Sequence, residues 1–149
     1  MAFNAYLKLT GTKQGTIKGS GTKGKQTGGI EIQEFSFGLE SPLDSQSGQA
    51  TGGRQHKPVV IVREVDVASP LLFQALCSNE TFTSATLSFV RPDASGKLPV
   101  ISTVELTNAT IFSITHAPSS GGKRRERIFF DYEQVLVNGL SNVAIPHSL

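Results

Sequence analysis

The chain has a single cysteine, Cys77, and no tryptophan among its 149 residues. One cysteine cannot form an internal disulfide, and its position among apolar residues predicts a buried, unreactive thiol. Charged residues make up only 17% of the chain and the formal net charge is +2, too small to indicate a nucleic-acid partner. No apolar run approaches the roughly 18 residues of a membrane span, and the first residues alternate in polarity, unlike a signal peptide. These absences predict a protein that is made in the cytoplasm, does not insert into a membrane and does not leave by a cleaved signal.

Catalytic and metal-binding motifs are also missing. The three histidines are far apart in the sequence, and no pair has the spacing of metal ligands. Glu64 and Asp66 share one strand face, as do Asp131 and Glu133, but the solvated side of a strand explains such pairs as well as acid–base chemistry does. No nucleophile elbow, Walker-type loop or dinucleotide fingerprint is present. The sequence therefore predicts no enzyme activity, no metal and no cofactor.

Alternating and β-branched segments predict about seven strands. These segments are residues 2–10, 30–39, 59–67, 81–90, 100–106, 110–116 and 125–137. The last is expected to be the longest. A change of phase near Gln33 and Glu34 indicates a β-bulge, Thr107 and Asn108 predict a break between two strands, and residues 117–123 predict a turn.

Residues 69–78 form the only convincing helix signal. Ser69 offers a hydroxyl that can cap a helix, and Pro70 suits its first position. The predicted apolar face consists of Leu72, Phe73, Leu76 and Cys77. A helix of about two turns is not stable alone in water, so a sheet should cover that face. The prediction is one domain that is mainly β, a two-sheet sandwich or barrel with one short helix on its side.

Two long polar segments interrupt the strands. Residues 11–29 are rich in glycine and lysine, so this segment is either a solvated loop or a contact for an acidic partner. Residues 41–57 separate two strand signals and are expected to form the protruding tip of a long hairpin. A basic cluster follows later in the chain, at Lys123, Arg124, Arg125 and Arg127. This cluster is either the solvated end of a strand or a binding site.

Four segments, in this order, resemble the Hcp family, the tube protein of bacterial type VI secretion systems. They are residues 1–9 (MAFNAYLKL), 30–38 (IEIQEFSFG), 65–75 (VDVASPLLFQA) and 126–137 (ERIFFDYEQVLV). The resemblance covers nearly the whole chain, and the ordered set is more specific than any one motif. The chain departs from the family in lacking the tryptophan that many members have near the second strand.

The resemblance implies a homohexameric ring, with rings stacked into a hollow tube. A contractile sheath would expel this tube with a spike protein at its tip, and effector proteins would travel in the lumen. The chain would then be secreted by the type VI route, without catalysis. In such a tube the polar loop is expected to join stacked rings, through Leu43, Asp44, Gln49, Arg54, His56 and Lys57.

Two alternatives remain open from the sequence. A phage or phage-like tail-tube protein would have the same physical features, and neighbouring genes would distinguish it. A β-sandwich enzyme or carbohydrate-binding module is the more distant alternative. An enzyme would need a converging polar cluster, and a sugar site usually needs exposed aromatic residues, whereas the chain has no tryptophan and two tyrosines.

Overall fold

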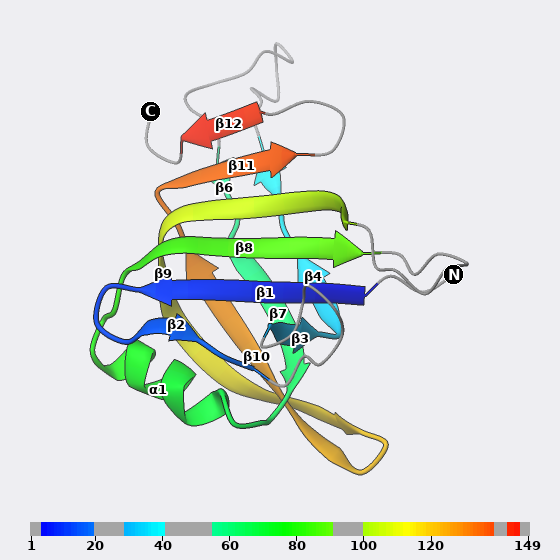
Figure 1. Ribbon diagram of the computed structural model, residues 1–149. Helices are drawn as coiled ribbons and strands as arrows, with labels where there is room; N and C mark the ends of the chain where they lie inside the picture. Colours follow the sequence, from blue (N-terminus) through cyan, green and yellow to red (C-terminus); the bar gives the residue numbers. More distant parts are fainter. Residues whose placement is uncertain (1–3, 20–28, 41–54, 91–99, 139–142, 147–149) are drawn as a thin grey trace, which may run out of the picture.

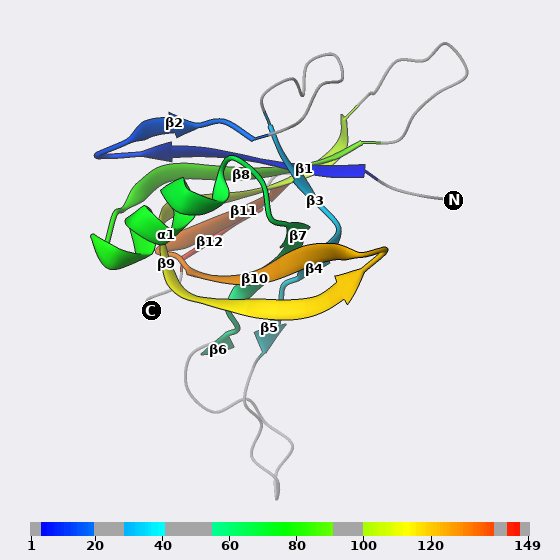
Figure 2. The same cartoon turned by 90° about the horizontal axis from the view of Figure 1, so that it is seen from below.

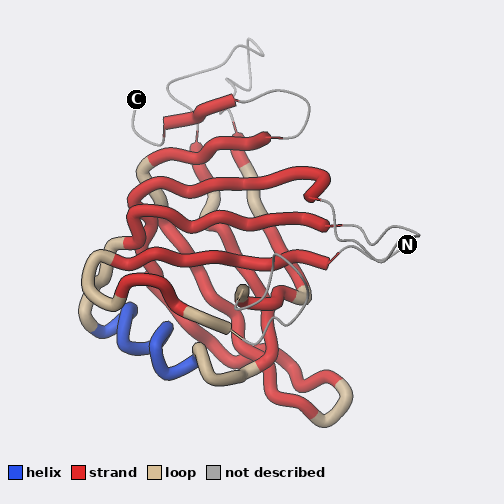
Figure 3. The backbone as a smooth tube through the Cα atoms, viewed as in Figure 1, coloured by secondary structure: helices blue, strands red, loops and turns tan. Residues whose placement is uncertain are grey.

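The structure is a computed structural model that describes residues 4–19, 29–40, 55–90, 100–138 and 143–146. Strands form most of it, and one short helix lies at its side (Figure 3). The elements are β1 (Asn4–Gly11), β2 (Gly15–Ile17), β3 (Ile30–Ile32), β4 (Glu34–Ser36), β5 (Leu39–Glu40), β6 (Gln55–His56), β7 (Val59–Glu64), α1 (Ser69–Cys77), β8 (Phe82–Val90), β9 (Val100–Ser120), β10 (Lys123–Asp131), β11 (Gln134–Asn138) and β12 (Val143–Pro146). No helix in these ranges is long and apolar enough to cross a membrane. The predicted class, mainly β with one short helix, is confirmed.

The strands pair antiparallel and form two layers (Figures 1 and 2). In the first sheet β2 and β3 share one edge of β1, and β8, β9, β11 and β12 follow in that order. The second sheet has the order β9-β10-β7-β4. Residues 30–36 contribute to both sheets, because β3 pairs with β1 whereas β4 pairs with β7. The phase change near Gln33 is therefore a bend where the chain passes from one sheet to the other.

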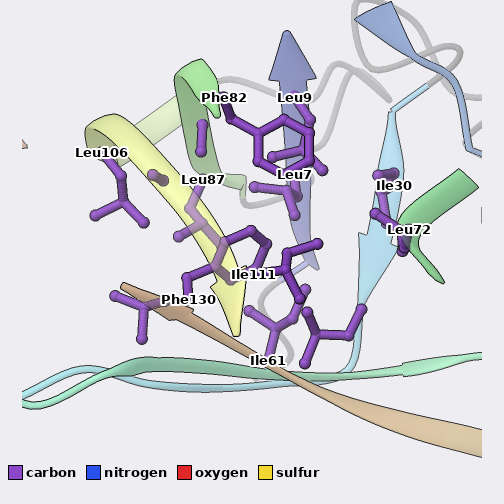
Figure 4. Close-up of a cluster of buried hydrophobic side chains, with 14 of the residues drawn as sticks. Leu7, Leu9, Ile30, Ile61, Leu72, Phe82, Leu87, Leu106, Ile111 and Phe130 are labelled. Atoms are coloured by element: carbon purple, nitrogen blue, oxygen red, sulfur yellow. The ribbon is translucent and has the colours of Figure 1, made fainter. Parts of the chain in front are cut away.

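The core lies between the two sheets and under the helix (Figure 4). Leu7, Leu9, Phe82 and Leu87 enter it from the first sheet, and they meet Ile61, Ile128 and Phe130 from the second; all seven are almost fully buried. Burying each such side chain contributes about 1.5–3 kcal/mol. The helix adds Leu72, which closes one end of the same cluster.

One long strand belongs to both sheets. β9 is 21 residues long; its first half pairs with β8 and its second half with β10. Asn108 has a φ of 51°, a left-handed conformation that asparagine tolerates better than most residues. The predicted strand end at Thr107 and Asn108 is therefore wrong, because the chain bends there and continues into the second sheet.

The predicted single strand over residues 125–137 is also wrong, since it divides into β10 and β11. The buried side changes at the division, from Phe130 and Tyr132 to Val135. Glu133 lies at this corner, where its N–H donates to the Thr107 carbonyl oxygen at 3.0 Å. Its carboxylate accepts a hydrogen bond from the Asn108 side chain at 2.9 Å. The two strands thus change sheets side by side, and these bonds join the two bends.

The hairpin between β9 and β10 is tighter than predicted. Its turn consists of Gly121 and Gly122, with φ values of 60° and 76°. Two consecutive positive φ values are typical of a type I′ turn, whose twist matches that of the flanking strands. The strands therefore extend to Ser120 and Lys123, instead of ending before a turn over residues 117–123.

The helix lies where it was predicted, and Leu72 and Leu76 of its predicted apolar face pack against the core, but Phe73 and Cys77 do not. Leu72 and Ala75 point into the core, whereas Phe73 is 43% exposed and Cys77 is exposed. The predicted burial of Cys77 is therefore wrong. The predicted cap is wrong too, since Ala68 is the N-cap residue and makes no side-chain bond. The Ser69 hydroxyl instead accepts the Asp66 N–H at 3.0 Å, which orders the turn that leads into the helix.

Candidate interaction surfaces

The described part of the predicted protruding loop is its base. β5 and β6 pair antiparallel with Leu39 opposite His56, and the Lys57 N–H donates to the Gly38 carbonyl oxygen at 3.0 Å. This ladder is what the start of a long hairpin requires. Four of the residues predicted to join rings, Leu43, Asp44, Gln49 and Arg54, lie outside the described residues.

The base of this hairpin is attached to the corner between β10 and β11. The His56 Nδ1 atom lies 2.7 Å from the Tyr132 hydroxyl oxygen, and the two rings meet edge to face at 5.3 Å. Burial raises the pKa of Tyr132 to about 12, and the charge of Asp131 adds to the shift. Tyr132 therefore keeps its proton at any ordinary pH. Further ring contacts connect Tyr132 through Phe37 to Phe35 and Phe89, so an aromatic series links the hairpin base to β8.

Two members of the predicted basic cluster bind groups of the same chain. Arg125 is held by its own chain, because its guanidinium binds the Glu34 carboxylate at 3.0 Å and the Pro118 carbonyl oxygen at 2.8 Å. The Lys123 ammonium lies 3.7 Å from Glu64, and both side chains are exposed, so this pair contributes little. Arg124 is exposed near the hairpin turn and Arg127 is half-buried on the strand. The cluster therefore serves partly to hold the hairpin against β4 and β7.

A buried ionic network that the sequence reasoning missed lies beneath the start of α1. Arg63 on β7 is 1% exposed and binds both Glu126 on β10 and Asp66 before the helix. The Ser69 hydroxyl donates to Glu126 at 3.0 Å, and the Asp66 carboxylate accepts the Ala68 N–H at 2.8 Å. Four polar side chains thus connect the helix to two strands of the second sheet.

A period-two signal for this network was present in the sequence. Arg63 has the same parity as the buried Val59 and Ile61, and Glu126 has the same parity as the buried Ile128. Two charges of opposite sign on inward-facing positions of neighbouring strands predict a buried pair.

A second missed group is Glu80, which is 1% exposed and follows the helix. Its carboxylate accepts the Lys13 N–H at 2.9 Å, the Gln14 N–H at 2.7 Å and the Gln14 side-chain amide at 2.9 Å. Burial alone would raise the pKa of Glu80, but the hydrogen bonds from Gln14 and Lys13 outweigh it and lower the pKa. Part of the predicted polar loop 11–29 is therefore the ordered β1–β2 turn, fixed to the end of α1.

Within the described residues, no group of three or more His, Cys, Asp or Glu side chains is arranged to hold a metal ion. Their exposed large hydrophobic side chains are Leu39, Val67, Leu71, Phe73 and Phe112. The rings of Phe112 and Phe129 pack against each other on the outer face of the second sheet, with their centroids 6.0 Å apart. Leu71 and Phe73 belong to α1, and Val67 lies in the turn before it.

Comparison with known proteins gives consistent relatives. The family described as "Type VI secretion system effector, Hcp" matches residues 6–138. A protein of Pseudomonas aeruginosa named "Major exported protein" is 39% identical over 123 residues, which cover 76% of this chain and 72% of that protein.

Solved structures of similar proteins have the same fold. The crystal structure of an Hcp protein has a TM-score of 0.88 at 24% identity, over 99% of both chains. Hcp1 from E. coli EAEC 042 has a TM-score of 0.88 at 23% identity, over 98% of this chain and 99% of that one. Secreted protein Hcp3 from Pseudomonas aeruginosa has a TM-score of 0.71 at 29% identity, over 94% and 95% of the two chains. Sequence and fold agree over nearly the whole length, so this chain belongs to the Hcp family of type VI secretion proteins.

Proposed function

We propose that this chain is the subunit of the inner tube of a type VI secretion system. Six copies form a ring, and rings stack into a hollow tube that the contractile sheath expels behind a spike protein. Effector proteins travel in the lumen, and the chain itself leaves the cytoplasm by the same route. The observation that carries the proposal is the family match over residues 6–138.

The second sheet supports this assembly because it has two free edges. Within the described residues, β4 pairs only with β7, and the second half of β9 pairs only with β10. An unpaired edge presents a row of backbone N–H and C=O groups that can bind another chain. The two edges are different surfaces on opposite sides of one sheet. Their contact between copies is therefore heterologous, and such a contact forms a ring when the rotation closes.

Stacking of the rings is assigned to the hairpin that begins at β5 and β6. Its base is fixed to the rest of the chain by the bond between His56 and Tyr132. Deletion of residues 46–53 should leave a folded subunit that still forms rings, but stacking should weaken because the reaching part of the hairpin is shortened. Electron micrographs that show unchanged tubes would contradict the role of this hairpin. A matched control is deletion of residues 21–28 from the other long polar segment.

Light scattering after size-exclusion chromatography, followed by negative-stain imaging, tests the function as a whole. The expected result is a particle of six subunits with a central hole. A protein that stays monomeric at high concentration would contradict the proposal. A phage or phage-like tail-tube protein would form similar rings, and the genes beside the coding sequence decide between the two.

A further inference from the structure

A pocket of about 250 Å³ lies between the base of the β5–β6 hairpin and the second sheet. Three parts of the chain that are distant in the sequence line it, through His56, Pro58, Thr110, Phe112 and Asp131. Pockets for drug-sized ligands have volumes of about 300–1,000 Å³. This pocket therefore has room for a smaller group, of the size of one side chain.

The walls of the pocket are fixed before any ligand binds. The His56 Nδ1 atom lies 2.7 Å from the Tyr132 hydroxyl oxygen, and this bond holds the imidazole in place. Thr110 and Asp131 are direct partners in the ladder between β9 and β10. A preformed site orders few groups when a ligand binds, so little of the binding free energy is lost to entropy.

The lining combines one negative charge with an aromatic ring. Asp131 is exposed, and Phe112 is 52% exposed although its ring packs against Phe129. The lining residues that the structure describes include no lysine or arginine. A carboxylate and the face of an aromatic ring both attract cations and repel anions. The pocket therefore favours a positively charged group.

Contacts inside the chain do not prevent Asp131 from binding a ligand. Its side chain also interacts with other groups of the same chain. An ionised carboxylate has about four acceptor positions on its two oxygen atoms, so it can bind several donors at once. The Thr110 hydroxyl, opposite Asp131 in the ladder, adds a further acceptor to the same pocket.

Among cations, the guanidinium group fits this lining best. It is planar, so it can bind a carboxylate through two parallel N–H donors while its face lies on an aromatic ring. It is also more weakly hydrated than an ammonium group, so it enters a partly apolar pocket more readily. We propose that the pocket binds a guanidinium group, paired with Asp131 and stacked on Phe112. A small guanidine compound and an arginine side chain of another protein both supply this group.

Saturation-transfer NMR of the full chain tests the proposal with three ligands of similar size. They are n-butylguanidinium, n-butylurea, which is planar but uncharged, and n-butylammonium, which is charged but not planar. Wild-type protein should bind n-butylguanidinium at least about fivefold more tightly than either of the others. Equal affinities for the three ligands would overturn the proposal.

An arginine tripeptide with blocked ends distinguishes the two sources of the group. If this peptide binds at least as tightly as n-butylguanidinium, the pocket accepts an arginine side chain within a polypeptide. If it binds at least about tenfold more weakly, the flanking backbone is excluded and the ligand is a small guanidine compound. Both results support a guanidinium site.

Two variants test the roles of the lining residues. Asp131→Asn should weaken n-butylguanidinium binding about tenfold, because the charged acceptor becomes a neutral amide of the same shape. Phe112→Leu should weaken it about threefold, since the aromatic face is lost. Glu64→Gln is the matched control and should leave the affinity unchanged, because Glu64 is a partly exposed carboxylate of the same sheet outside the pocket. Equal weakening by Asp131→Asn and Glu64→Gln would indicate a general charge effect and overturn the proposal.

The lack of tryptophan in the chain allows a second measurement. Phe112→Trp places a single indole in the pocket, and tryptophan is the best aromatic partner for a cation, so the affinity should rise about twofold. The tryptophan fluorescence should change with the dissociation constant that NMR gives. Fluorescence that stays constant while the NMR signal saturates would place the ligand elsewhere and overturn the proposal. All lining residues belong to one subunit, so these results do not depend on whether the chain forms rings.

Discussion

Replacement of Arg63 by methionine should destabilise the subunit more than almost any other single change. Arg63 is 1% exposed and holds two carboxylates, those of Glu126 and Asp66. Methionine has a similar length but no charge, so Glu126 would remain buried without its cation. Breaking a buried ion pair from one side costs about 3–5 kcal/mol, because the remaining charge stays desolvated.

The double variant Arg63→Met/Glu126→Leu should recover most of this loss. Replacing both members of a buried pair by apolar side chains is often neutral or stabilising by about 1–4 kcal/mol. Asp66 keeps its bond to the Ala68 N–H, and its side chain is 16% exposed, so it remains partly hydrated in the double variant. The two sites should therefore show a large coupling energy in a double-mutant cycle.

Urea unfolding at low protein concentration measures the free energies, and a thermal melt checks them. A loss of this size should lower the melting temperature of Arg63→Met by about 10 °C, given about 2–4 °C per kcal/mol for a chain of this length. Glu64→Gln is the matched control, because this neighbouring carboxylate is solvent-exposed and contributes little. A cost below about 1 kcal/mol for Arg63→Met, or a double variant less stable than both single variants, would refute the reasoning.

Two further changes test the fixed turns of the fold. Glu80→Gln should cost about 1–3 kcal/mol at pH 7, because the carboxylate that accepts from Lys13 and Gln14 becomes an amide. The pKa of Glu80 is lowered in the folded chain. The ionised carboxylate therefore stabilises the fold fully at a pH above the ordinary carboxyl pKa near 4.3, and this stabilisation is lost as the pH falls through the lowered pKa of the folded chain. Wild type and variant should thus converge in stability in strong acid; a constant difference down to pH 2 would count against this. Gly122→Val should cost about 1–2 kcal/mol, because valine is strained at a φ of 76°. Gly122→Asn should cost less in the same unfolding assay, and equal costs would exclude backbone strain as the cause.

The location of the helix could be predicted from the sequence, but its orientation could not. Ser69 and Pro70 identify its start, whereas both faces of a helix of nine residues are apolar here. Leu72 with Phe73, and Leu72 with Ala75, fit the helical period equally well. The choice between them depends on the Arg63 network and on β9, which are distant in the sequence.

The strands were predictable wherever one face alone is buried. Alternation identified the inner positions of β10 correctly, since Ile128 and Phe130 recur every second position, but it missed the end of that strand at Asp131. It failed where a strand changes sheets. At Asn108 and Tyr132 the pattern of burial changes because the neighbouring strand changes, and a local pattern contains no information about that neighbour.

The interaction surfaces were the least predictable part. Lys123, Arg124 and Arg125 are adjacent in the sequence, but the alternation of side chains along a strand directs Arg124 to the opposite side from Lys123 and Arg125. Arg125 also forms an ion pair with Glu34. The burial of Arg63 and Glu126, in contrast, could have been predicted, because both occupy the alternate positions of their strands that face the core.

The sharing of β9 between both sheets has a mechanical consequence. In a sandwich whose sheets are joined only by loops, a pull on one sheet reaches the other through side-chain packing, which yields easily to sliding. Here a single strand of 21 residues, bent at Asn108, runs from one layer into the next. A load applied at one end therefore passes along covalent bonds, while the ladders to β8 and β10 resist it in shear along their length.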